Sequence, residues 1–591
     1  MLEGERSYQR GQENLVPGNN ASSVPENPVI PKAQEKPWYI QHFIKLLIGF
    51  GLGGGTVALL LPWVLWQHCG MSSSSSDQLR LHLLYVTGGI IAVLTLLQTN
   101  WKNQGDRLKI DADIKKNEQD AEKNQRDHIR QVHAERRSRY TKAVEQLADE
   151  KATVRLGGIY TLVGLVDEWL ADDSLEQDEQ QKEGQVIINS LCSYVRSPFP
   201  LAEKIEEYEA HQELENLQKL ESEKLGEEVS SRLQILLSRF KDSDEYEKPK
   251  DITTDYAQFH EEQDVRHAIF VEMSKRSSTF TRDGVGKVID TFPGMWSDFD
   301  FDFSRAPIFY PLNTITIEKG NFSSAKFYSN ADFSGTTFTQ KADFSGTAFA
   351  QTADFSGTTL AQTADFSWAK FTQTADFSWA IFTQKVDFSR AKFTQKTDFS
   401  GAKFTQKTDF SWVNFTQKVD FSWATFIETA YFSRVNFTQK ADFSWTTFTQ
   451  TAYFDRARFF QTADFSWAKF FQTGDFRGGT FIQNANFSSA TFKKHSPHFV
   501  ATAHGKSGKA YRARFAALSE KQPAHNFAVH EDSRPILLGE TELDNIKYNL
   551  PTGTVLFDPD SWDKEKQEYT RVSEPAKPLD ESNGAEENKP E

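Results

Sequence analysis

The chain has 591 residues and a formal net charge of −15, with 38% hydrophobic and 25% charged residues. This length predicts several domains, and the composition is ordinary for a soluble chain that carries a small membrane part. Only two cysteines are present, Cys69 and Cys192, which excludes a disulfide framework and a cysteine-based metal site.

The N-terminal region predicts a disordered arm followed by a membrane hairpin. Residues 1–38 are rich in Asn, Ser, Pro, Glu and Gln and lack a signal-peptide pattern. Within residues 39–101, two apolar runs at about 45–66 and 82–100 are long enough to span the hydrocarbon core. The alternative is a helical hairpin buried in a globular domain.

Charges flanking the two runs predict the orientation of the hairpin. Lysines and arginines precede the first run and follow the second, whereas the intervening loop holds only Asp77 and Arg80. By the positive-inside rule, both termini and the rest of the chain are expected in the cytoplasm and the Ser72–Ser76 loop outside. We therefore expect a multi-pass protein of the plasma (inner) membrane.

Helical segments fill most of the next 200 residues. Residues 102–138 are mostly charged or amidated, which predicts a solvated helical stalk; a weak coiled coil that forms a homodimer is the alternative. Residues 139–200 show helical apolar spacing, and Val154-Arg-Leu-Gly-Gly-Ile-Tyr160 is similar to a HEAT-like helical repeat. Residues 201–256 predict an acidic helical insertion, and residues 257–295 a helix and connector.

Residues 320–495 contain an eleven-residue unit that occurs sixteen times, with Phe at its third and eighth positions. Repetition at a fixed period predicts a stacked array. In an eleven-residue helical repeat, two Phe five positions apart would lie about 130° apart, too far to share one apolar stripe. The units are also filled with Ser, Thr, Gly and Phe, which disfavour helices. A β-structure is therefore expected.

Divided after its fifth residue, the unit resembles the motif of the pentapeptide-repeat family. Ala331-Asp-Phe-Ser-Gly-Thr-Thr-Phe-Thr-Gln-Lys341 gives two pentads, each with a large apolar third residue, plus one further residue. The resemblance implies a right-handed quadrilateral β-helix in which each pentad forms one side, and the large residue and the small residue two before it point inwards. The chain departs from the family pattern because Phe replaces the commoner Leu and every second side has six residues. The expected core includes Phe333, Phe338, Phe344, Phe349, Phe355 and Phe366.

The unit allows two arrangements. Two units per coil give 22 residues per turn and about eight coils. One unit per coil gives a flattened, two-sided solenoid, which leaves little room for the inward Ala and Thr beside two bulky Phe. The four-sided form is preferred. Solenoids need capped ends, so we expect a cap at 296–319, a C-terminal cap at 496–560 and a disordered tail at 561–591.

The fifth position of the unit should point outwards, and in the four-sided form every second unit stacks into one column. The first column, here called the Trp/Arg column, contains Trp368, Arg390, Trp412, Arg434 and Arg456. Its Arg and Trp are expected within cation–π distance. The second, the Trp column, contains Trp379, Trp423, Trp445 and Trp467. The Trp column is the candidate partner-binding face; the alternative is stacking that only stiffens the rod.

Together, the hairpin, helical region and repeats resemble bacterial membrane-anchored pentapeptide-repeat proteins. No catalytic, cofactor-binding or metal-binding motif is present, so we expect no enzyme activity and no cofactor. The predicted function is a membrane-tethered scaffold for a protein partner. The alternative is a DNA mimic that regulates a type II topoisomerase, as some members of the family do. Residues 331–492 carry 14 acidic and 15 basic side chains, so the acidic field that mimicry needs is absent, and nucleic-acid binding is not expected either.

Overall fold

The computed structural model describes residues 36–219, 227–241, 250–282, 288–312, 315–501, 511–519, 522–565 and 568–579. Most of the expected N-terminal arm, residues 1–35, lies outside the described residues. The chain divides into two compact units, Met1–Arg130 and Gln131–Glu591.

The first unit contains a helical hairpin. Its first arm comprises α1 (Trp38–Gln41), α2 (Phe43–Ile48), the π-helical turn η1 (Gly49–Gly53) and α3 (Gly54–Cys69), and α4 (Ser73–Leu147) begins the second. Phe43–Cys69 and α4 are each long and apolar enough to cross a membrane, and only 6% and 0% of their most apolar stretches are buried. This exposure disagrees with the alternative of a hairpin buried in a globular domain. A Cβ on Gly54 would lie 2.3 Å from Thr87 Cγ2, so glycine is what allows the two arms to approach here.

The turn between the arms is shorter than the sequence predicted. Gly70, with φ of 68°, ends α3, and the N–H of Ser75 donates to Oγ of Ser72 (3.3 Å) at the start of α4. A serine at this position satisfies a free N–H of the first helical turn. Residues 73–76 therefore belong to α4, and the expected loop over Ser72–Ser76 is wrong. α4 also continues without a break through the expected boundaries at 101 and 138.

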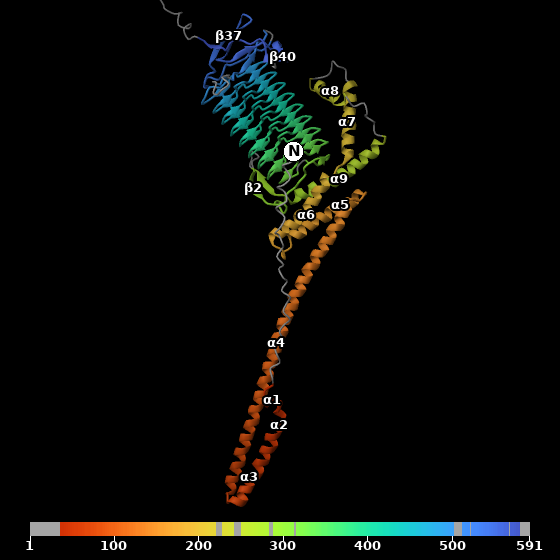
Figure 1. Ribbon diagram of the computed structural model, residues 1–591, viewed down its shortest axis with the longest axis vertical. Coiled ribbons are helices and arrows are strands. Elements are labelled where there is room, and N and C mark those ends of the chain that lie inside the picture. Colours follow the sequence, from red (N-terminus) through yellow and green to blue (C-terminus); the bar gives the residue numbers. More distant parts are fainter. Residues whose placement is uncertain are drawn as a thin grey trace, which may run out of the picture. The chain divides into compact units, whose positions relative to one another are not determined.

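The second unit begins with a helical region. In the described residues, α4 is followed by α5 (Ala152–Leu170), α6 (Gln177–Arg196), α7 (Pro200–Lys219), α8 (Glu227–Phe240) and α9 (Ile252–Arg276). α5 packs against α6 and α9, and α7 packs against α8 and α9. The apolar faces meet in one core through side chains such as Leu162, Leu191 and Ile269. Figure 1 shows α5, α6 and α9 at one end of the solenoid.

A buried ionic network fixes α9 to its neighbours. Arg266, only 2% exposed, donates to Oε1 of Glu262 (2.7 Å) and to the carbonyl oxygen of Val195 (2.9 Å). Glu262 also pairs with Arg155 of α5 (3.1 Å) and accepts from the hydroxyl of Tyr194 (3.0 Å). Burial and the adjacent Glu262 carboxylate raise the pKa of Tyr194. Because each buried charge has an opposite charge beside it, the pairing offsets part of the desolvation cost, and the network links three helices.

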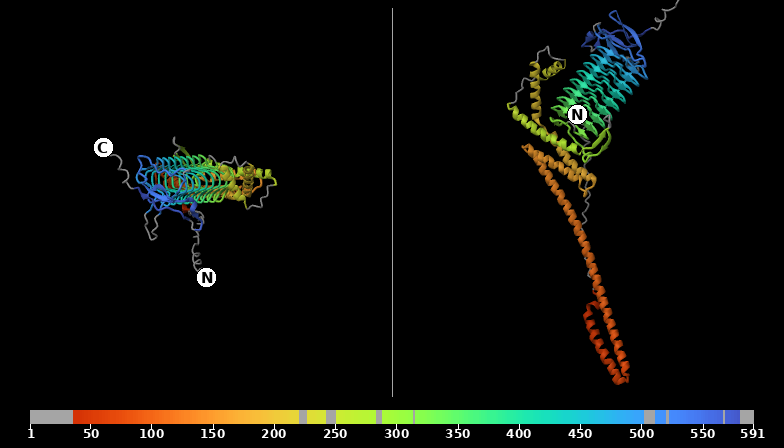
Figure 2. Two further views of the ribbon diagram at one scale, coloured as in Figure 1. Left: turned by 90° about the horizontal axis from the view of Figure 1, so that it is seen from above. Right: turned by 180° about the vertical axis from the view of Figure 1, so that it is seen from behind.

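Four parallel sheets form the solenoid in the described residues. The first runs from β4 (Gly320–Asn321) to β32 (Gly474–Asp475), and the second from β3 (Pro307–Ile308) through β5 (Lys326–Phe327) to β33 (Thr480–Phe481). The third runs from β6 (Ala331–Asp332) to β34 (Ala485–Asn486), and the fourth from β7 (Thr337–Phe338) to β35 (Thr491–Phe492). Each coil passes through the β4–β32, β3–β33, β6–β34 and β7–β35 sheets in this order, and Figure 2 shows the coils from above.

The register settles the number of units per coil. Ala353 lies opposite Ala375, and Lys370 opposite Lys392, so each strand pairs with the strand 22 residues further along the chain. The predicted four-sided β-helix with two units per coil is confirmed, and the two-sided alternative is wrong. Pairing also begins earlier than expected, because β3 within the expected cap at 296–319 pairs with β5.

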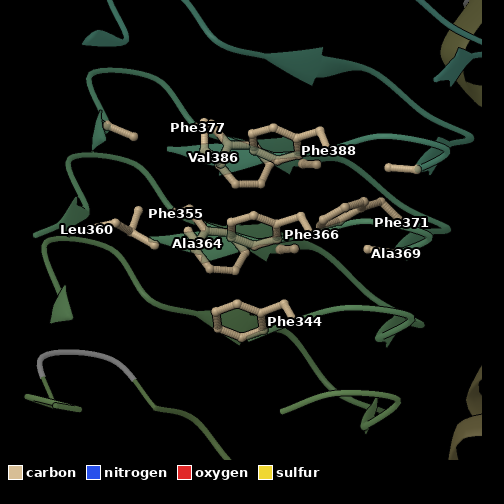
Figure 3. Close-up of a cluster of buried hydrophobic side chains, with 14 of the residues drawn as sticks. Phe344, Phe355, Leu360, Ala364, Phe366, Ala369, Phe371, Phe377, Val386 and Phe388 are labelled. Atoms are coloured by element: carbon tan, nitrogen blue, oxygen red, sulfur yellow. The ribbon is translucent and has the colours of Figure 1, made fainter. Parts of the chain in front are cut away.

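The phenylalanines fill the interior in two kinds of ring contact. Along the axis, Phe366 stacks on Phe344 (centroids 5.0 Å apart) and on Phe388 (4.8 Å). Across the coil, Phe355 meets Phe366 edge to face at 5.4 Å and 89°. Figure 3 shows this stack, with Ala364 and Ala369 beside the rings. All six core residues proposed from the sequence are fully buried: Phe333, Phe338, Phe344, Phe349, Phe355 and Phe366.

Aromatic contacts continue into both ends. At the start, Phe270 of α9 lies 4.6 Å from Phe303, which lies 5.3 Å from Phe322 of the first repeat. At the other end, β36 (Arg514–Ala516) and β39 (Val555–Phe557) extend the second sheet, here called the β3–β39 sheet, and Phe515 stacks on Phe481 at 4.9 Å. The open ends of the Phe core are thereby covered.

The expected disordered tail from 561 is wrong for its first part. After the hairpin β37 (Leu538–Leu543) and β38 (Ile546–Pro551), the strands β40 (Trp562–Asp563), β41 (Glu568–Tyr569) and β42 (Lys577–Pro578) are ordered. β42 pairs with β37, and Ala576 beside it is 3% exposed. Main-chain pairing needs no apolar pattern, so a segment rich in Glu, Lys and Pro can still add a strand. Residues 580–591 lie outside the described part.

The ring stack predicts a large cost for truncating one phenylalanine. Phe388 is fully buried between Phe366 and Phe410. We expect Phe388→Ala to reduce the free energy of unfolding by about 3–5 kcal/mol, because the lost ring leaves a cavity. Urea unfolding of the full chain in detergent, followed by circular dichroism, measures this.

Leu360→Phe is the matched control. Leu360 lies in register between Phe338 and Phe382, where a ring would continue the column. We expect this variant to unfold at the same urea concentration as the native chain or higher. A Phe388→Ala variant as stable as the native chain would contradict the role given to the stack.

Candidate interaction surface of the solenoid

The repeated aspartates stabilise turns. The N–H of Ser367 donates to Oδ1 of Asp365 (2.8 Å), and the same bond joins Ser389 to Asp387 (2.9 Å). Side chains that bond the backbone two residues further on favour such turns. Burial raises the pKa of Asp442, but hydrogen bonds from Lys440 and Ser444 outweigh this and hold the pKa below its ordinary value. The Asp carboxylates are thus engaged within the coil.

The fifth position adopts a left-handed backbone. All nine residues of the Trp/Arg and Trp columns have φ angles between 57° and 63°. Gly335, Gly346, Gly357, Gly401 and Gly478 occupy the same position elsewhere, with φ between 62° and 70°. A residue with a Cβ is disfavoured in this region by roughly 1–2 kcal/mol. The backbone therefore favours glycine where the chain places Trp or Arg.

The two columns lie at opposite corners of the coil. The Trp/Arg column follows the β4–β32 sheet and precedes the β3–β39 sheet. The Trp column follows the β6–β34 sheet and precedes the β7–β35 sheet. Since a coil has four corners in this order, the columns are diagonal to each other.

Arginines of the Trp/Arg column lie over aromatic rings. Cζ of Arg390 is 4.7 Å from the ring centre of Trp368, and Cζ of Arg434 is 4.4 Å from that of Trp412. Arg456 lies over Tyr511, at 4.3 Å. All three distances are within cation–π range. Tyr511, beyond the repeats, was not among the residues proposed from the sequence.

The Trp column contains one continuous stack and one separate indole. Trp423 and Trp445 are 4.8 Å apart and 2° from parallel, and Trp445 and Trp467 are 4.9 Å apart and 3° from parallel. Trp379 instead lies against Gly401, where an added Cβ would be 2.9 Å from its ring. Trp379 is 70% exposed and Trp423 is 60% exposed. Indole surface therefore faces solvent along this corner.

A cavity at the end of the Trp/Arg column was missed by the sequence analysis. Its volume is about 590 Å³, and five arginines line it: Arg434, Arg456, Arg458, Arg512 and Arg514. Arg458 stands at the seventh position of its unit, where this sheet otherwise carries Lys, Asn, Ala or Thr. Arg512 and Arg514 follow the repeats, where the repeat period gives no register. Within the described residues, no group of three His, Cys, Asp or Glu could hold a metal ion.

Comparison with known families agrees with this architecture. Residues 322–367, 355–403 and 399–444 match the sequence model of the family described as Pentapeptide repeats (9 copies). Neither the curated proteins nor the solved structures contain a match to the chain.

The left-handed backbone predicts opposite effects of alanine and glycine at neighbouring positions. Trp423→Ala and Trp423→Gly remove the same indole, but alanine must retain a positive φ. We expect the alanine variant to be less stable than the glycine variant by about 1 kcal/mol. Urea unfolding of both variants measures the difference.

Thr425, in β23 (Thr425–Phe426), provides the control two residues away. Here glycine should be less stable than alanine, because a strand gains nothing from glycine's freedom. If the stability difference between the alanine and glycine variants had the same sign at Trp423 and Thr425, the assignment of backbone strain to the fifth position would be contradicted.

Proposed function

We propose that this chain is a non-enzymatic, membrane-tethered scaffold that presents its pentapeptide-repeat solenoid to a protein partner through the Trp column. The observation that supports this most directly is Trp379. Its neighbours in the column are Gly357 and Gly401, so no indole lies above or below it. Stacking with other indoles, the alternative role for the column, does not account for an isolated Trp that is 70% exposed.

Backbone strain supports the same reading. Glycine fills this corner at Gly335, Gly357 and Gly401 without loss of the β-helix. Each Trp at the corner is accepted against a local cost of roughly 1–2 kcal/mol. Strained residues often mark functional sites. The indoles are therefore not required by the turn itself, which favours a role in contact with another molecule.

The chemistry of the column suits a protein surface. Trp is enriched among the residues that contribute most to protein–protein affinity. Rigid aromatic side chains also lose little conformational entropy on binding. We expect the partner protein to present an apolar groove. This groove would accept the indoles of the Trp column, which follow one another along the solenoid axis. The Asp carboxylates keep their charge, but the 15 basic side chains of residues 331–492 offset the 14 acidic ones, so the solenoid offers no acidic field of the kind a DNA mimic needs.

Membrane tethering and its orientation belong to the same proposal. The two apolar helices would cross the plasma membrane, with the turn at Gly70 outside and the solenoid in the cytoplasm. The support is the exposure of the apolar side chains in α3 and α4 and the distribution of Lys and Arg around the hairpin.

Replacement of three indoles by glycine tests the partner surface. The change is Trp379→Gly, Trp423→Gly and Trp445→Gly, and glycine retains the backbone of the corner. We expect proteins crosslinked to the native chain in membranes to be lost from this variant, because their apolar contacts are removed.

Trp368→Gly and Trp412→Gly, at the opposite corner, are the matched control. This pair should keep the partner. Loss of the partner in both variants, or in neither, would contradict binding at the Trp column, provided that circular dichroism shows both chains folded.

Native Cys69 tests the orientation. Cys69 is exposed at the end of α3, whereas Cys192 is buried. A membrane-impermeant maleimide added to intact cells should therefore label the chain from outside at Cys69 alone. Cys69→Ser should abolish the labelling. Labelling that requires cell lysis would reverse the proposed orientation.

A further inference from the structure

The Arg-lined cavity lies where one coil of the solenoid carries small outward residues between coils that carry long ones. Arg458 lies opposite Thr480, and Thr480 opposite Arg514, so one short residue separates two long ones along the β3–β39 sheet. At the adjacent corner, Gly478 has φ of 70° and stands where the five preceding coils carry Trp or Arg. Thr480 and Gly478 therefore leave a hollow that the arginines surround.

The cavity concentrates positive charge that the chain leaves unpaired. In the part of the chain that the structure describes, none of the five arginines forms an ion pair. Nearby arginines do: Arg477 pairs with Asp475, and Arg571 with Asp544 and Asp558. The nearest carboxylate in sequence, Asp455, instead accepts a hydrogen bond from the hydroxyl of Ser433. Like charges held together without partners repel each other, so the arrangement favours an anion.

Several contacts hold the guanidinium groups in place without neutralising them. Arg434 lies over Trp412, and Arg456 over Tyr511. Nη1 of Arg512 donates to the carbonyl oxygen of Gly553 at 2.7 Å. Guanidinium groups oriented in advance lose less entropy when they bind a ligand. The cavity is thus preorganised for a group that accepts several hydrogen bonds.

We propose that this cavity binds a small anion that carries two or more phosphate groups. A guanidinium group can donate two parallel hydrogen bonds to two phosphate oxygens. The positive charge of five guanidinium groups exceeds the negative charge of one carboxylate or one phosphate monoester. A volume of about 590 Å³ lies within the range of small-molecule sites. Asn436 and Thr480 add neutral hydrogen-bonding groups to the lining. This site is independent of the proposed partner surface at the opposite corner.

Calorimetric titration of pyrophosphate into the full chain in phosphatidylcholine nanodiscs tests the proposal. We expect saturable binding of pyrophosphate, and weaker binding of orthophosphate by about tenfold or more. Arg458→Gln and Arg514→Gln should each weaken pyrophosphate binding by about tenfold or more, because each removes a charged hydrogen-bond donor.

Lys392→Gln is the matched control. Lys392 is exposed in the same sheet, in the same outward column as Arg458, but outside the cavity. The Lys392→Gln substitution removes one positive charge, as the two arginine substitutions do. It should change the affinity for pyrophosphate by no more than about twofold, because an exposed charge beyond the screening length contributes little to binding. Circular dichroism of the three variants should match the native chain.

Two further titrations identify the source of the phosphates. Binding only to vesicles that contain a phosphoinositide, lost in Arg458→Gln and Arg514→Gln, would support the site and assign it to a lipid headgroup. Absence of binding to pyrophosphate and to such vesicles would overturn the proposal. Binding of a single-stranded oligonucleotide weakened equally by Lys392→Gln and Arg458→Gln would overturn it in favour of an extended basic track.

Discussion

The stacking of phenylalanine rings at the spacing of parallel strands is the interaction on which the solenoid depends. Each strand in the repeats has only two residues, so its hydrogen bonds alone specify the register weakly. A shift of one residue would turn the rings out to solvent. Near-parallel stacks such as Phe366 on Phe388 fix the register along the axis, and edge-to-face contacts such as Phe355 with Phe366 fix the rings across the coil. The repeated Phe side chain therefore provides both the buried apolar surface and the strand register, which in sheets with longer strands come from many different side chains.

The corners follow from the need to keep every Phe pointing inwards. A four-sided coil must turn sharply after each strand, and at the corners that follow the β4–β32 and β6–β34 sheets an Asp carboxylate that accepts from a Ser N–H begins the turn. The residue two positions after the buried Phe then adopts a positive φ and points away from the core. Glycine satisfies this geometry, as Gly335 and Gly357 demonstrate. Trp and Arg at the same position are thus free of any role in the core, and their side chains remain for stacking, binding or both.

The parts of the fold that the sequence could predict are those carried by a period. The 5, 6 spacing of Phe predicted the solenoid, and the 22-residue coil predicted which outward residues share a column. Where the period ends, prediction failed for a physical reason. Arg514 pairs with Thr480 across a connection without repeats, so no spacing reveals that Arg458, Arg512 and Arg514 surround one cavity. β42 joins β37 through main-chain bonds, which leave no apolar pattern. The short turn at Gly70 depends on a serine cap that a run of five serines obscures.

Both candidate surfaces place side chains at a corner residue with a positive φ, but the two surfaces offer different interactions. At the Trp column, uncharged indoles present an apolar ridge; at the other corner, arginines held over Trp412 and Tyr511 present concentrated charge. Residues 331–492 are nearly neutral, with 14 acidic and 15 basic side chains, so the charge is segregated rather than in excess. The acidic side chains mostly serve the turns, whereas the five arginines of the cavity, which form no ion pair within the described residues, gather at one end of the β3–β39 sheet and its adjacent corner. Because the corners are diagonal and the core between them is close-packed, a protein at one and a small anion at the other would not compete for space.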